Sequence, residues 1–202
     1  MSLRPEVIVF DLGKVLLDFD YGITARQLAP FCREPERVIS AAINQTELLF
    51  RYERGELDTA AFFDEFRRAT GYQGSFAQFR QAFGGIFSPI PAMVDWWRKL
   101  AAKGYRTWIF SNTNELAIEH IRQTFPFFSG FEGHVLSYEV RCMKPDSRIY
   151  EALEQRTGCR GEAILYLDDR QENVSAGLAR GWAARCHENP DRTIGELGFL
   201  LA

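Results

Sequence analysis

Short, continuous apolar runs of strand length recur along the chain and alternate with amphipathic segments of helix length. The first run, Val7–Phe10, is rich in β-branched residues and ends at Asp11, a pattern typical of a strand buried on both faces of a parallel sheet. Similar runs follow at 108–110, 134–136, 163–167 and 182–186, and helical patterns lie over 92–103, 115–124, 146–157 and 172–180. This alternation predicts an α/β protein with a parallel sheet between helices.

Residues 21–88 interrupt the alternation. They contain no run typical of a strand, and their aromatic residues fall at helical spacings, which indicates core packing. These residues are Phe62, Phe63, Phe66, Phe76, Phe79 and Phe83. So long a connection predicts a subdomain of its own over the carboxyl end of the first strand, where ligands bind in open α/β sheets. We therefore predict a Rossmann-like parallel sheet core (residues 1–18 and 89–202) with an inserted α-helical subdomain (residues 19–88).

Charge and composition exclude several classes of protein. The net charge is −3 and no basic block is present, so we expect no nucleic-acid partner. No apolar run reaches the ~18 residues of a membrane helix, and no leader peptide is evident at Met1, so we expect a cytoplasmic protein without a membrane partner. The cysteines form no CxxC motif, and we predict four buried thiols, at Cys32, Cys142, Cys159 and Cys186.

Polar groups stand at or just beyond the carboxyl ends of the predicted strands. Each has a structural alternative, because an acid or amide there can form a turn or cap the next helix, and a Lys-Pro-Asp segment can begin one. The groups are Asp11, Ser111–Asn112, Lys144–Asp146 and Asp168–Asp169. Since parallel strands present their carboxyl ends at one edge of a sheet, we expect all of them to meet in one crevice.

Together these groups predict phosphate chemistry. Carboxylates that face each other repel unless a cation lies between them, and oxygen ligands suit Mg²⁺. Lys144 supplies a positive charge, and the Ser111 hydroxyl supplies a donor. The set fits a phosphoryl dianion held between Mg²⁺ and the lysine, with one carboxylate free to attack phosphorus.

The same segments resemble the four ordered motifs of the haloacid dehalogenase superfamily over essentially the whole chain. The central helical segment resembles that family's cap, and Glu53–Leu57 followed by Phe62 resembles a recurring cap segment. The similarity is greatest to bacterial sugar-phosphate phosphatases, including the glucose-1-phosphate type, and to the phosphatase domain of soluble epoxide hydrolases. The four motifs are Asp11–Val15, Ser111–Asn112, Lys144–Asp146 and Leu167–Asp169 with Asn173.

The resemblance implies roles for the residues that contact substrate. Asp11 is expected to be the nucleophile and to form an aspartyl-phosphate intermediate. Ser111 and Asn112 are expected to hold the phosphoryl oxygens, and Lys144 to neutralise both the nucleophile and the phosphate. The substrate implied is a small phosphorylated metabolite.

It also implies a Mg²⁺ site. Asp11, the backbone carbonyl of Gly13 and Asp169 are expected to be metal ligands, with Asp168 and Asn173 in supporting positions around them. The carbonyl ligand does not depend on the side chain at position 13.

One position departs from the family pattern. Phosphatases of this family usually carry a second Asp two residues after the nucleophile, which protonates the leaving oxygen and later activates water. Here that position is Gly13, and general acid–base help is typically worth about 10²–10⁴-fold. Asp18, Asp20, Glu47 and Glu53 are alternative donors.

Three functions compete. The first is a Mg²⁺-dependent phosphatase, with a sugar 1-phosphate as a candidate substrate. The second is a metal-independent haloacid dehalogenase, which also attacks through Asp11 but whose carboxylate substrate would be repelled by Asp168–Asp169. The third is a binding module without turnover, suggested by Gly13 and opposed by the retained acidic and lysine residues. We favour the phosphatase.

Overall fold

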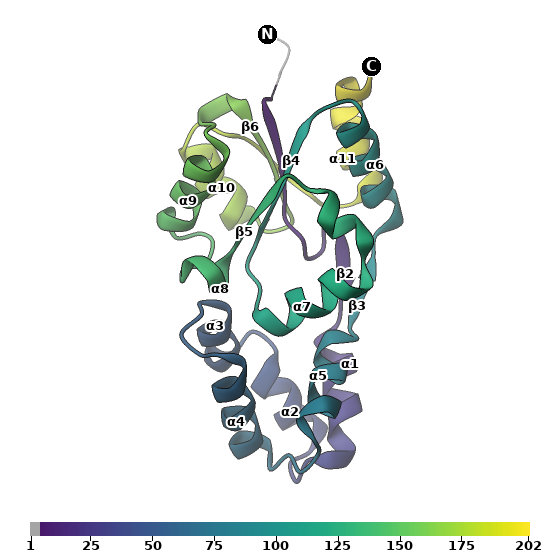
Figure 1. Cartoon of the computed structure of the whole chain (residues 1–202), viewed down its shortest axis with the longest axis vertical. Helices are drawn as coiled ribbons and strands as arrows, with labels where there is room; N and C mark the ends of the chain where they lie inside the picture. The colour runs from purple at the N-terminus through teal and green to yellow at the C-terminus, as the bar shows by residue number, and fades with distance from the viewer. Residues whose placement is uncertain (1–4) are drawn as a thin grey trace.

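A five-stranded, wholly parallel sheet forms the centre of one lobe of the molecule (Figure 1). The structure is a computed structural model that describes residues 5–202, so the first four residues of the predicted core lie outside it. The strand order is β5-β4-β1-β6-β7. The strands are β1 (Val7–Phe10), β4 (Arg106–Ser111), β5 (Gly133–Leu136), β6 (Ile164–Asp168) and β7 (Ala183–Cys186). The predicted α/β fold is confirmed.

Helices cover both faces of this sheet, as Figure 1 shows. The predicted helical segments are present to within one residue at each end, and several end at a left-handed glycine such as Gly158, with φ 73°. The helices are α6 (Pro91–Ala102), α7 (Glu115–Thr124), α8 (Ser137–Val140), α9 (Ser147–Thr157), α10 (Gln171–Ala179) and α11 (Pro190–Leu197). Short 3₁₀ segments lie at Ala29–Phe31, Pro126–Gly130, Gly161–Ala163 and Gly198–Leu201.

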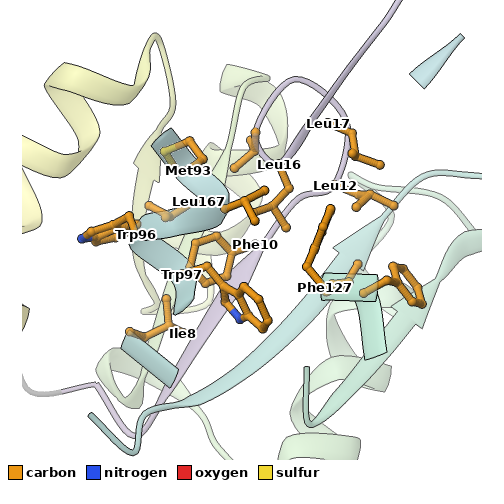
Figure 2. Packing of buried hydrophobic residues seen from close by; sticks show 14 of the residues in the cluster. Ile8, Phe10, Leu12, Leu16, Leu17, Met93, Trp96, Trp97, Phe127 and Leu167 are labelled. Carbon is orange, nitrogen blue, oxygen red and sulfur yellow. The ribbon is translucent and has the colours of Figure 1, made fainter. Parts of the chain in front are cut away.

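Alternate residues of β1 point to opposite faces and fill two apolar layers. Ile8 and Phe10 pack towards α6, where Trp96 meets Phe10 edge-on at 5.9 Å between ring centroids (Figure 2). Val7 and Val9 pack on the other face, among side chains of α9 and β6. Because β1 is fully buried, the end of this strand is held rigidly at the rim of the sheet.

The second lobe is a block of five helices built around stacked aromatic rings. Phe62, Phe66, Phe79 and Phe83 are buried as predicted, whereas Phe76 is 42% exposed. The prediction of a core position is wrong for Phe76, because it begins its helix and meets Phe63 only at the block's surface. The helices are α1 (Tyr21–Leu28), α2 (Glu36–Ile43), α3 (Glu47–Glu53), α4 (Thr59–Thr70) and α5 (Phe76–Gly84).

A two-stranded antiparallel ribbon joins the lobes. It pairs β2 (Leu17–Phe19) with β3 (Phe87–Pro89). The prediction that residues 21–88 contain no strand is therefore wrong at Phe87 and Ser88, since three residues are too few to show an alternating pattern. The ribbon holds both ends of the helical block together beside the carboxyl end of β1.

Two smaller predictions need comment. All four cysteines are free, but only Cys142 and Cys159 are buried, because Cys32 and Cys186 lie at the edges of their elements and are half-buried. Within residues 5–202, no helix has both the length and the hydropathy needed to cross a bilayer.

Candidate active site

Asp11 directly follows β1 and lies at the rim of the sheet between the two lobes. Its Oδ1 accepts a hydrogen bond from the Leu12 N–H at 2.7 Å and lies 3.1 Å from Lys144 Nζ. The side chain is 11% exposed and faces the cavity between the lobes. One carboxylate is thus fixed by the backbone and a cation while remaining open to a ligand.

Lys144 is the buried cation of the site. Its Nζ donates to Asp168 Oδ2 at 2.6 Å and to the Phe110 carbonyl oxygen at 2.8 Å. The Asn112 side chain holds the lysine backbone at both ends: Nδ2 donates to the Lys144 carbonyl at 3.0 Å, and Oδ1 accepts the Lys144 N–H at 2.8 Å. The Asn112 amide therefore positions the lysine. The buried Ser111 hydroxyl donates to the Asn112 carbonyl at 3.3 Å, and the predicted phosphate contacts fall to this hydroxyl and the Asn112 backbone N–H.

Asp168 ends β6 and is fully buried. Besides the lysine, it accepts from Asn173 Nδ2 at 3.0 Å, from the Arg170 N–H at 2.8 Å and from the Tyr166 hydroxyl. Asp169 is half-buried and lines the cavity. Asp168 forms a turn just before α10 through the Arg170 N–H, although no side chain caps that helix. Asn114 caps α7 and Asp146 caps α9, so these structural roles accompany the site.

The three carboxylates of Asp11, Asp168 and Asp169 converge. One oxygen from each can be chosen so that all three lie within 4.8 Å of one another. Three carboxylates facing a single lysine leave the cluster negatively charged, and an all-oxygen donor set of this kind fits Mg²⁺. Gly13 lies beside them on the cavity wall.

The protonation of the cluster reflects this crowding. Burial raises the pKa of Asp11 to about 7; Lys144 opposes the rise, and the charges of Asp168 and Asp169 add to it. Burial and the charge of Asp168 also raise the pKa of Asp169. Burial also acts to raise the pKa of Asp168. The charge of Lys144 and the hydrogen bonds from Lys144, Tyr166 and Arg170 together outweigh this effect of burial, so the pKa of Asp168 lies below its ordinary value. A cation beside Asp11 and Asp169 would favour their ionised forms.

The space beside Gly13 is filled by an aromatic ring. A Cβ atom at position 13 would lie 2.8 Å from Cε1 of Phe19. That ring packs against Tyr21 at 5.6 Å and Phe87 at 6.0 Å. The ribbon between the lobes therefore occupies the place of a side chain two residues after Asp11.

The cavity has a polar floor and a wall of mixed character. Its volume is about 370 Å³, at the small end of the range for ligand sites. The floor is the polar cluster described above. The wall includes Leu17, Phe19, Tyr21, Leu49, Phe50, Phe87, Ile121 and Met143, with Asp20, Asn44, Gln45 and Glu53 among its polar members.

The sequence matches one known family over most of its length. Residues 5–181 match the hydrolase family described as haloacid dehalogenase-like hydrolase. This chain is a haloacid dehalogenase-like hydrolase. The resemblance to the superfamily is confirmed, while the closer resemblance to sugar-phosphate phosphatases stays a prediction.

Relatives of this haloacid dehalogenase-like hydrolase include a phosphatase and dehalogenases. The sesquiterpene phosphatase astK of Aspergillus oryzae is 24% identical over 187 residues, which cover 90% of this chain and 89% of that protein. An (S)-2-haloacid dehalogenase of Pseudomonas fluorescens is 30% identical, but over only 47% of this chain and 42% of that protein.

Solved structures share the fold. A HAD family enzyme from Bacteroides thetaiotaomicron, in complex with magnesium and inorganic phosphate, has a TM-score of 0.82 at 22% identity and covers 92% of this chain and 95% of its own. The L-2-haloacid dehalogenase of Xanthobacter autotrophicus has a TM-score of 0.66 at 18% identity, and the match covers 96% of this chain and 83% of that chain.

Two residues of this hydrolase's site were missed in the sequence. Tyr166 donates to Asp168, and the period of two along a strand could have revealed it, since the two residues share a face of β6. Phe19 fills the space at Gly13, and no sequence signal marks that contact because it depends on the turn that brings β2 back beside Gly13.

Proposed function

We propose that this hydrolase is a Mg²⁺-dependent phosphatase that acts on a small phosphorylated metabolite through an aspartyl-phosphate intermediate on Asp11. The observation that carries the proposal is the convergence of the three carboxylates of Asp11, Asp168 and Asp169 on the buried Lys144. Such a site suits a divalent cation with a phosphoryl dianion.

Each residue then has a proposed role. Asp11 attacks phosphorus, and Lys144 favours the ionised form of Asp11 and offsets charge on the phosphoryl oxygens. Ser111 and the backbone of Asn112 bind those oxygens. Asp11, the Gly13 carbonyl and Asp169 would hold Mg²⁺, and Asp168 and Asn173 support them through the hydrogen bonds they already make. Bound Mg²⁺ would supply a positive charge to the phosphoryl oxygens.

Residues 1–18 and 89–202 are proposed as the catalytic core and residues 19–88 as a cap. The cavity supports this division, because the core provides its charged floor and the helical block provides much of its wall. In this arrangement the cap selects the organic part of the substrate.

Two kinds of leaving group suit the site. A sugar 1-phosphate stays the predicted preference over a 6-phosphate, because its anomeric oxygen leaves more readily without an acid at position 13. The apolar wall of Phe19, Phe50 and Phe87 supports an apolar alcohol phosphate, which is the kind of substrate named for the sesquiterpene phosphatase relative.

The test is a panel of phosphate esters assayed with Mg²⁺ and with EDTA. It should contain hexose 1- and 6-phosphates, isoprenoid monophosphates and aryl phosphates, with 2-chloropropionate as the dehalogenase substrate. We expect Mg²⁺-dependent release of phosphate from at least one ester. Chloride release that is indifferent to EDTA would support the dehalogenase instead, and turnover of nothing in the panel would support the binding module.

A further inference from the structure

The proposed phosphatase needs a proton donor that position 13 does not provide. Phe19 fills the space beside Gly13, and its packing on Tyr21 and Phe87 holds it there. The candidates for such a donor are the four other carboxyl groups named in the sequence analysis.

Three of the four alternative carboxyl groups are exposed and already engaged. Asp18 is 58% exposed and pairs with Lys14. Asp20 is 60% exposed and caps α1 by accepting a backbone N–H at 2.7 Å. Glu47 is 70% exposed and pairs with Arg54 at 2.5 Å. All three side chains are therefore solvent-exposed and already bonded to another group.

Glu53 differs from these three in its burial and its hydrogen bonding, although Asp20 also lines the cavity. It is 9% exposed, it ends α3 and it lines the same cavity as Asp11. Within residues 5–202, its carboxyl group takes part in no hydrogen bond or salt bridge. Burial raises the pKa of Glu53 to about 7; Arg170 opposes the rise and the charge of Asp11 adds to it.

The helix that carries Glu53 is fixed to the core lobe. The Tyr52 hydroxyl accepts the Leu116 N–H, at the start of α7, at 3.1 Å, and its ring stacks on Phe62 at 4.3 Å. Gly55 has φ 64°, and a Cβ there would lie 2.3 Å from the Tyr138 carbonyl oxygen. Only glycine permits this approach, and it brings the end of α3 beside α8 (Figure 1).

We propose that Glu53 is the general acid and base of the reaction, supplied by the helical block in place of an acid at position 13. This proposal rests on the phosphatase function proposed above. In the first step an Asp11 oxygen bonds to phosphorus, the bond from phosphorus to the leaving oxygen breaks, and that oxygen takes the Glu53 proton to become an alcohol. In the second step the Glu53 carboxylate takes a proton from water, whose oxygen attacks phosphorus and releases phosphate and the Asp11 carboxylate.

The surroundings of Glu53 allow both halves of this cycle. The groups that face it are Asp11 of the core, Arg170 of the loop after β6, and the half-buried Tyr21 of α1. On the neighbouring helices, Glu65 of α4 pairs with Arg51, and Glu139 of α8 lies beside His134, Arg122 and Arg156. A carboxyl group that titrates near neutrality can donate a proton and then accept one.

The experiment compares leaving groups in Glu53→Gln, with Glu47→Gln as the matched control. Both changes replace a carboxyl by an amide on α3, but Glu47 lies outside the cavity lining. Single-turnover phosphorylation rates are measured for a series of aryl phosphates and for an alkyl phosphate that the wild type hydrolyses. We expect Glu53→Gln to slow the alkyl phosphate by about 10²–10⁴-fold and the most activated aryl phosphate by less than about 10-fold.

The dependence of rate on leaving-group pKa should therefore become steeper in Glu53→Gln and stay unchanged in Glu47→Gln. Glu53→Asp moves the carboxyl by one methylene, so its rate should depend on leaving-group pKa more steeply than in wild type and less steeply than in Glu53→Gln. This variant provides a second test if Glu53→Gln folds poorly. Equal losses for all leaving groups, or no loss, would overturn the role of Glu53. A wild-type enzyme that hydrolyses no phosphate ester would instead overturn the proposed function itself.

Discussion

Replacing Lys144 by Met should destabilise the protein strongly, and the loss should depend on pH. The Lys144 side chain is 1% exposed and lies 2.6 Å from Asp168 and 3.1 Å from Asp11. It is also the donor to the Phe110 carbonyl. Methionine keeps the length of the side chain but removes the charge and the donor, so two buried carboxylates lose their counterion.

The expected loss is large for a single substitution. Removing one partner of a buried ion pair costs about 3–5 kcal/mol, and in a domain of this size that corresponds to a fall in Tm of about 10 °C. Asp168 has a lowered pKa in the folded state, so its stabilising contribution is present above its unfolded pKa of ~3.9 and is lost as pH falls through the folded value. Without Lys144, burial raises the pKa of Asp168, and the variant loses stability as pH rises instead.

The assay is urea unfolding in EDTA at pH 5 and pH 8, with the exposed Lys99→Met as a control. We expect the free energy of unfolding of Lys144→Met to fall further below that of the wild type at pH 8 than at pH 5. For the control, we expect the free energy of unfolding to change by no more than about 0.5 kcal/mol. If Lys144→Met were as stable as wild type at pH 8, the buried ion pair would not be the charge-balancing element inferred here.

Three further substitutions test the site. Asp169→Ala should weaken Mg²⁺ binding by at least ~10-fold, which is the loss typical when a residue that only hydrogen-bonds to a metal ligand is replaced. Titration calorimetry measures the affinity, and an unchanged affinity would show that Asp169 is not a ligand. Glu53→Gln should make the protein more stable at pH 8 by up to about 3 kcal/mol. The pKa of Glu53 is about 7 in the folded protein, so the wild type loses stability as pH rises from the pKa of the unfolded chain towards 7. Equal free energies of unfolding for the two proteins across this pH range would contradict the burial of this carboxyl. In the Glu53→Gln background, Gly13→Asp should restore alkyl phosphate turnover only when Phe19→Leu is also present, because the Phe19 ring blocks position 13. Rescue by Gly13→Asp without Phe19→Leu would show that the ring moves freely.

The core of the fold followed from local pattern. Continuous apolar runs predicted the buried strands, and the motif residues met at one edge because parallel strands share their carboxyl end. Asp11, Lys144 and Asp168 were found in this way, since each stands next to a strand or helix that periodicity marks.

What the sequence did not reveal depends on packing between segments far apart in the chain. The ribbon of β2 and β3 is too short for an alternating pattern, and Phe76 shares the helical spacing of the buried aromatics while lying at a helix end. The engagement of the Asn112 amide with the Lys144 backbone likewise requires the tertiary structure. Of the four alternative acids, Glu53 is distinguished by its burial and by its lack of a bonded partner within residues 5–202, and both are properties of the folded lobes.

The covalent intermediate tests the central claim most directly. A phosphate ester that the enzyme hydrolyses, labelled in its phosphoryl group, is mixed with enzyme and Mg²⁺ and quenched with acid within one turnover, and the labelled peptide is identified by mass spectrometry. The account predicts an acid-stable, hydroxylamine-sensitive acyl phosphate on Asp11, absent in EDTA and in Asp11→Asn. Turnover without a labelled protein, or a label on another residue, would contradict it.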